Sequence, residues 1–142
     1  MGTSIEDNIV AWRADELRKV PALIRFISYE PALGPIDLVD LTDIDWLIYG
    51  GESGPNFRPA EPSWPREIRD RCAAEGIAFF HKQSEGQWSG MNARLDGVLH
   101  HTFPRKSRVR SSSEDSIAGD SSQSEDADLA KAAAPRLEIA AD

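Results

Sequence analysis

The sequence contains a single cysteine, Cys72, among its 142 residues. One thiol excludes an internal disulfide and any metal site built from several cysteines of this chain, and it fits a reducing compartment. No apolar run approaches the roughly 20 residues that a membrane span needs, and the N-terminus lacks the basic, apolar and small-residue segments of a signal peptide. These absences favour a cytoplasmic protein that does not contact a membrane.

Positive charge is also scarce, since 24 acidic residues outnumber 16 basic ones and set the net charge at −8. Most of the imbalance lies in residues 111–142, which hold eight acidic and two basic residues. That segment is rich in serine and alanine, has no aromatic residue and cannot bury enough apolar surface to offset the entropy of ordering. We therefore predict one domain over residues 1–106, followed by a basic linker and a disordered acidic tail over residues 107–142.

Three short runs of large apolar residues predict buried strands, at residues 23–29, 45–49 and 77–80. The second run ends in Gly50-Gly51, a pair that suits a turn with positive φ and a close approach of two backbones. Neighbouring parallel strands end at one edge of a sheet, where α/β folds place their ligand sites. A charged residue follows each predicted strand: Glu30, Glu52 and Lys82.

Two helices are predicted, one before the first of these strands and one between the second and the third. Apolar residues within 9–20 indicate a helix that Pro21 ends. The second helix starts at Ser63, which we assign as its N-cap, and stops at Gly76. Its apolar face is expected to consist of Trp64, Ile68, Cys72 and Ala73.

The alternation of helix and strand predicts an α/β fold with three to four parallel strands and crossover helices. A sheet of this size has two open edges and an incomplete cover of helices. We therefore expect the isolated chain to be oligomeric, aggregated or molten, because even complete domains are only marginally stable.

Residues 26–38 and 45–54 closely resemble a bacteriophage-associated family of unknown function, the three-Cys-motif or phage gene-product family, which looks like a radical S-adenosylmethionine (SAM) barrel. The resemblance extends over roughly residues 3–106 and includes these shorter motifs: Thr3-Ser4-Ile5-Glu6-Asp7-Asn8, Arg58-Pro59, Trp64, Arg69-Asp70, Cys72, Gly76, Phe79-Phe80, Lys82-Gln83, Arg94-Leu95-Asp96-Gly97 and Phe103-Pro104.

The resemblance implies a partial (β/α) barrel that lacks its N-terminal half. In the family, that half carries a cysteine cluster similar to those that hold [4Fe–4S], and nothing in this chain corresponds to it. Ligation of such a cluster needs several thiolates. We therefore expect no cofactor in this chain, whereas the full-length family would use S-adenosylmethionine and [4Fe–4S]. A truncated gene, a split gene and a remnant all fit this departure.

Together with the strand-end argument, the resemblance implies ligand contacts for five residues: Glu6, Glu30, Glu52, Arg58 and Lys82. The carboxylates would bind a ligand's amine or ribose hydroxyls, or instead accept loop N–H groups or pair with Arg58. Arg58 would clamp a phosphate or carboxylate through two hydrogen bonds, or hold its own loop in an ion pair. Lys82 would face the same pocket or remain solvated. No catalytic residue is assigned.

Other kinds of site are disfavoured. The glycines around Glu52 have neither the Walker lysine nor the G-x-G-x-x-G spacing, and Ser53 does not stand in a G-x-S-x-G turn. The three histidines, His81, His100 and His101, have no third ligand at a suitable spacing, so we expect no metal. Residues 105–110 are basic without interleaved aromatics, which leaves nucleic-acid binding open but favours a solvated linker or a partner for the acidic tail.

We interpret the chain as part of a phage-related, radical-SAM-like protein of unknown substrate that is not an enzyme by itself. The alternative is a non-catalytic interaction module that completes its sheet with a partner chain. The expected partner is an N-terminal barrel half or a second copy.

Overall fold

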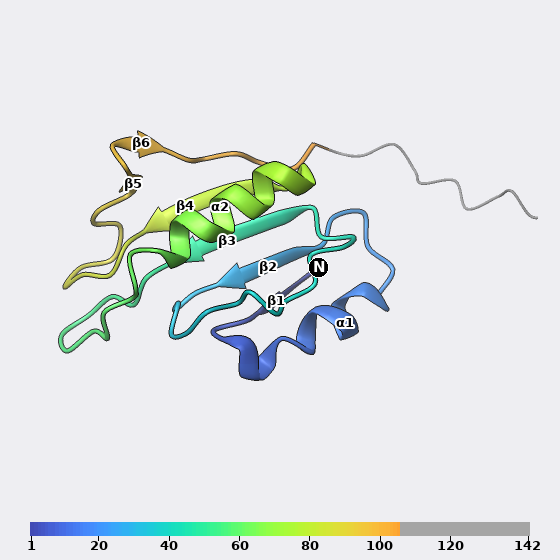
Figure 1. Cartoon of the computed structure of the whole chain (residues 1–142), viewed down its shortest axis with the longest axis horizontal. Helices are drawn as coiled ribbons and strands as arrows, with labels where there is room; N and C mark the ends of the chain where they lie inside the picture. The colour runs from blue at the N-terminus through green and yellow to red at the C-terminus, as the bar shows by residue number, and fades with distance from the viewer. Residues whose placement is uncertain (106–142) are drawn as a thin grey trace, which may run out of the picture. The chain divides into compact units, whose positions relative to one another are not determined.

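The structure is a computed structural model that describes residues 1–105. The predicted linker and acidic tail over 107–142 lie outside the described residues. In chain order the elements are β1 (Gly2–Ser4), the 3-10 turn η1 (Asn8–Val10), α1 (Arg13–Arg18), β2 (Phe26–Tyr29), β3 (Trp46–Gly50), α2 (Trp64–Glu75), β4 (Ala78–Gln83), β5 (Arg94–Leu95) and β6 (Val98–Leu99) (Figure 1).

The first four strands form one parallel sheet in the order β1-β2-β3-β4, which confirms the predicted fold class. Phe26 of β2 pairs with Gly2 on one side and with Trp46 on the other, and Trp46 pairs with Ala78. Because spatial order equals chain order and crossovers are right-handed, the crossover helices belong on one face of the sheet. Figure 1 shows α2 lying along β3 and β4, with α1 beside β1.

The helix-covered face of the sheet holds the core. Side chains alternate between the two faces of a strand, and every second residue of β2 and β3 is fully buried beneath the helices. These strand residues form one cluster with residues of both helices: Ile27, Tyr29, Leu47, Tyr49, Ala14, Leu17, Ile68 and Cys72. Burial of these apolar side chains is the main force that holds the helices on this face.

The opposite face of the sheet carries no helix among residues 1–105, and we call it the helix-free face. Two rings lie against this face: Phe103, with its centroid 5.5 Å from those of Trp46 and Phe80, and His101, stacked on Phe80 at 4.4 Å. The indole N–H of Trp46 is buried and has no hydrogen-bond partner within residues 1–105. The face remains only partly covered along its length, at Phe26, Ser28, Trp46, Ile48 and Phe80.

Residues 30–45, which connect β2 to β3, contain no helix. Ile36 and Val39 of this connection pack into the core. Arginines from both helices hold it in place, because Arg18 of α1 donates to the carbonyl of Asp40 at 2.9 Å. Arg71 of α2 donates to the carbonyls of Ile36 at 3.0 Å and Val39 at 2.7 Å. The connection is therefore fixed by side-chain donors rather than by helical hydrogen bonds.

The outer edge of β4 is paired, so the prediction of two open sheet edges is wrong there. Residues 100–102 run antiparallel to β4. The backbone N–H of His81 donates to the carbonyl of His100 at 2.7 Å, and that of Thr102 donates to the carbonyl of Phe79 at 3.0 Å. This pairing depends on the β5–β6 hairpin, which no periodicity in the sequence indicates.

Several predicted element bounds differ from the structure. The helix expected over residues 9–20 divides into η1 and the short α1, because the carboxylate of Asp7 caps a 3-10 turn first. Strand β2 begins at Phe26 rather than at residue 23. Strand β4 continues through Gln83 rather than ending at Phe80, since β3 and residues 100–102 supply partners on both sides.

Helix α2 follows the prediction more closely. Gly76 ends it with φ 72°, in the left-handed region that favours glycine. Ser63 precedes the helix as expected, but its side chain makes no cap hydrogen bond. Its carbonyl instead accepts from the N–H groups of Arg66 and Glu67. Ala73, predicted on the apolar face, is exposed.

Candidate functional site

The carboxyl ends of the four parallel strands lie at one edge of the sheet and bring together residues from distant parts of the chain. Glu6 follows β1, Glu30 follows β2 and Glu52 follows β3, while Lys82 lies near the end of β4. We call the five predicted contact residues the rim: Glu6, Glu30, Glu52, Arg58 and Lys82. Each rim carboxylate forms an ion pair within the chain.

Glu30 and Lys82 form an ion pair that crosses the end of β3. The Lys82 Nζ lies 2.7 Å from Glu30 Oε1. A Cβ on Gly50 would stand 2.7 Å from the carboxyl carbon of Glu30, so the pair depends on the missing side chain there. Gly50 follows Trp46 and Ile48 at intervals of two residues, so it faces the same side of the sheet as they do. The Glu30–Lys82 pair beside Gly50 therefore lies at the carboxyl end of the helix-free face.

Glu52 and Arg58 are joined within a single loop. Glu52 accepts from the Arg58 side chain at 2.6 Å (Nη2) and 2.9 Å (Nε), and from the Arg58 backbone N–H at 2.6 Å. These hydrogen bonds lower the pKa of Glu52 to about 2. Of the two alternatives for Arg58, the structure has the ion pair that holds the loop.

Glu6 pairs with Arg13 of α1, with Arg13 Nη1 3.1 Å from Glu6 Oε2. The same guanidinium nitrogen donates to the carbonyl of Ser4 at 2.9 Å. The backbone carbonyl of Glu6 accepts from Leu33 and Gly34 and so ties the end of β1 to the loop after β2. Sequence reasoning missed Arg13, because its role depends on α1 folding back beside β1.

Gly51 allows two loops to meet behind the rim. A Cβ on Gly51 would lie 2.2 Å from the backbone nitrogen of Glu85. Neither Gly50 nor Gly51 has a positive φ, whereas Gly54 does, at 124°. The prediction for the glycine pair is therefore correct for the close approach and wrong for the backbone dihedral.

Two buried polar residues of β4 support these loops and were not singled out for this role. Gln83 donates to the carbonyl of Gly51 at 3.1 Å and accepts from the N–H of Gly90 at 2.5 Å. The His81 ring stacks on Tyr49 with centroids 5.3 Å apart, and its Nδ1 lies 3.2 Å from the carbonyl oxygen of Ala93. Both are positioning residues for the loops rather than groups open to a ligand.

The described residues contain no group of three or more His, Cys, Asp or Glu side chains arranged to hold a metal ion. None of the helices in residues 1–105 has the length and apolar character needed to cross a membrane. Cys72 is fully buried in the core, and burial raises the pKa of its thiol to about 12.

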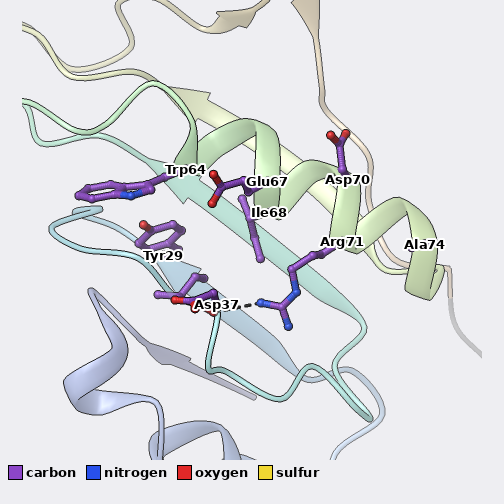
Figure 2. Close-up of a pocket in the computed structure, with 9 residues that line it drawn as sticks. Tyr29, Asp37, Trp64, Glu67, Ile68, Asp70, Arg71 and Ala74 are labelled. Atoms are coloured by element: carbon purple, nitrogen blue, oxygen red, sulfur yellow. Dashed lines mark hydrogen bonds between the residues drawn. The ribbon is translucent and has the colours of Figure 1, made fainter.

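A separate cavity of about 480 Å³ lies on the helix-covered face, between α2 and residues 30–45, which connect β2 to β3. Figure 2 shows Trp64, Glu67 and Ile68 of α2 on one side of it and Tyr29 and Asp37 on the other. This cavity is distinct from the rim, and sequence reasoning did not find it, because its walls come from segments that only the fold brings together.

The parallel sheet, its one-sided helical cover and the charged rim define a mixed α/β domain. The chain matches the model of a family described as "Protein of unknown function (DUF5131)" over residues 1–130, and it belongs to that family. No curated protein and no solved structure matches the chain. The family description mentions no phage, cysteine motif or barrel.

Proposed function

We propose that this chain is one part of a radical-SAM-like (β/α) barrel of a phage-related protein, with an unknown substrate and no activity by itself. The observation that supports this most directly is the one-sided cover of the sheet. In a (β/α) barrel the helices lie outside, the other face of the sheet points inward, and ligands bind at the carboxyl ends of the strands. The described sheet has this arrangement over four successive strands.

A second barrel segment, in the same or another polypeptide, would cover the helix-free face. Trp46 and Phe80 would then be buried, and the indole N–H of Trp46, which lacks a partner among the described residues, would gain one. The Glu30–Lys82 pair would lie inside the mouth of the closed barrel. Its partial exposure, 24% for Glu30 and 44% for Lys82, leaves both groups accessible to a ligand.

The rim suits a ligand that carries both charges. An ammonium group would replace Lys82 beside Glu30, and a carboxylate or phosphate would bind Lys82. S-adenosylmethionine has an ammonium and a carboxylate, and when bound it would supply the radical chemistry of such enzymes. These residues fit the polar end of that cofactor.

The residues of this chain do not fit a [4Fe–4S] cluster. Iron in such clusters is held by several thiolates, and Cys72 is a single, buried thiol with a raised pKa. The second segment would have to supply the cysteines.

Co-expression tests the proposal. The chain is produced alone and together with the N-terminal half of a three-Cys-motif family protein. We expect aggregation or self-association alone and a monodisperse 1:1 complex together, measured by sedimentation velocity. Ile48→Arg on the helix-free face should abolish the complex, whereas Ile9→Arg, at a position 83% exposed outside the sheet, should not. A sharp monomer alone, with cooperative unfolding and no complex, would overturn the proposal.

A second candidate is a non-catalytic interaction module that completes its sheet with a partner. The pairing of every rim carboxylate with a cation of the same chain favours it, because no rim charge then requires a ligand. Calorimetry with S-adenosylmethionine separates the two. Formation of the complex without ligand binding, or without a loss of binding in Glu30→Gln, would favour the interaction module.

A further inference from the structure

The cavity on the helix-covered face is a groove along one side of α2. Its wall on α2 follows helical spacing and spans three turns, at Trp64, Glu67, Ile68, Arg71 and Ala74. At 1.5 Å per residue these positions extend over about 15 Å. The opposite wall includes Tyr29, at the end of β2, and Ile36, in the connection from β2 to β3.

The groove lies where a crossover helix would pack. In a sheet of this order each connection between neighbouring strands usually contains a helix, but the one from β2 to β3 has none. Helices that cover such a sheet pack about 8–10 Å apart. The connection from β2 to β3 occupies the part of the helix layer next to α1, because Arg18 and Arg71 donate hydrogen bonds to its carbonyl groups. The space beside α2 is left as the cavity, and its length suits one short helix.

Charge on the groove indicates what kind of helix fits. Glu67 is exposed, and its carboxylate makes no hydrogen bond or ion pair with any of residues 1–105. Figure 2 shows its carboxylate to one side of the rings of Trp64 and Tyr29. Arg71, the only cation in the groove wall, is directed to the carbonyls of Ile36 and Val39. An acid beside two aromatic rings suits a Lys or Arg side chain, through charge and cation–π attraction.

We propose that this groove docks a basic amphipathic α-helix of a partner protein. The apolar stripe of that helix packs at the mouth of the groove on Trp64 and Ala74, above the buried Tyr29, Ile36 and Ile68, and a Lys or Arg one turn away binds Glu67 beside the Trp64 ring. The groove is separate from the rim, so this docking does not depend on the proposed barrel.

A synthetic peptide tests the groove with the full chain. The peptide has about 15 residues of leucine and lysine in helical spacing, long enough to cover the groove, and binding is followed by fluorescence anisotropy. Ala74→Arg should weaken binding by about tenfold or more, because the new side chain fills the groove and adds a cation. Ala73→Arg is the matched control: it is the neighbouring exposed residue, outside the groove, with the same change in charge. It should leave the affinity within about twofold.

A second variant tests the charge. Glu67→Gln should weaken the lysine peptide about fivefold or more and reduce the salt dependence of its binding, and melting curves would show that both variants remain folded. A peptide with glutamate in place of lysine should not bind.

Three results would overturn the proposal. Equal weakening by Ala73→Arg and Ala74→Arg would show attraction to the acidic chain as a whole. Tighter peptide binding after replacement of Lys106, Arg108 and Arg110 by glutamine would identify the chain's own basic segment as the occupant. Dissociation of a dimer by the peptide would identify a second copy.

Discussion

Gly51→Ala should be among the most destabilising single substitutions in the sheet, because its Cβ meets backbone rather than a movable side chain. The new carbon would lie 2.2 Å from the nitrogen of Glu85, 2.7 Å from the carbonyl carbon of Ser84 and 2.8 Å from the Cα of Glu85. Ordinary contact is about 3.5 Å or more, so one of the two loops has to move by about 1 Å.

The loops are joined by hydrogen bonds that such a movement would stretch. Gly51 donates to the carbonyl of Gln83 at 3.0 Å, and Gly86 donates to that of Glu52 at 3.1 Å. Overpacking costs about 1–3 kcal/mol, and each hydrogen bond lost adds about 1 kcal/mol. We expect a loss of about 3 kcal/mol in the free energy of unfolding, which corresponds to a fall of roughly 10–20 °C in melting temperature.

Thermal unfolding followed by circular dichroism measures this loss, with Gly86→Ala as the control in the facing loop. A Cβ on Gly86 meets nothing nearer than the Cβ of Met91 at 3.8 Å. That variant should be neutral or slightly more stable, because alanine restricts the unfolded chain. If Gly51→Ala melts within about 2 °C of the unchanged chain, the close approach of these loops is not what requires glycine there.

Further predictions concern the connection, the buried histidine and the thiol. Arg71→Met removes the donors to Ile36 and Val39 and should lower the free energy of unfolding by about 2 kcal/mol. The control Arg69→Met loses only exposed partners and should lower it by under about 1 kcal/mol. Equal losses in urea unfolding would refute this role for Arg71. Burial lowers the pKa of His81 from its usual 6.5, and His100 and His101 add to the shift, although the hydrogen bond to the Ala93 carbonyl and the charge of Glu85 oppose it. Above pH 6.5 the imidazole of His81 is neutral in both the folded and the unfolded chain, and just below it only the unfolded chain is protonated. The free energy of unfolding should therefore fall as the pH drops below about 6.5. The same pH dependence in His81→Gln would contradict this. Anaerobic reconstitution with iron and sulfide should produce no stoichiometric [4Fe–4S] absorption from a chain with one thiol, and a full chromophore would overturn the assignment.

The strand pattern of the sequence predicted the sheet because its signals are local. Apolar runs bounded by glycine and proline predicted the regions of β2, β3 and β4, and Gly76 marked the end of α2. The strand-end argument also placed Glu30, Glu52 and Lys82 at one edge. Each of these signals lies within a few residues of the feature that it predicts.

The features that sequence reasoning missed depend on contacts between distant residues. The antiparallel bridge of residues 100–102 forms on the backbone groups of Phe79 and His81 in β4. Likewise, β4 continues beyond Phe80 because Tyr49 and Gly50 of β3 pair with His81 and Gln83. Arg71 and, besides its pairing with Glu6, Arg13 donate to backbone carbonyl groups, which no residue type in a sequence marks. The groove beside α2 exists because a helix is absent from one connection.

Within residues 1–105, the pairing of one sheet edge makes the domain extensible on one side only. Residues 100–102 pair with the outer edge of β4 through an antiparallel bridge, and a further parallel unit could not be added there without displacing them. On the other side β1 is a short parallel edge strand whose order in space matches its order in the chain. Gene fusion or duplication that places another strand–helix unit before β1 would therefore extend the sheet without rearranging any existing strand. In evolution or in design, new strand–helix units would therefore be added on the amino-terminal side of the sheet, beside β1.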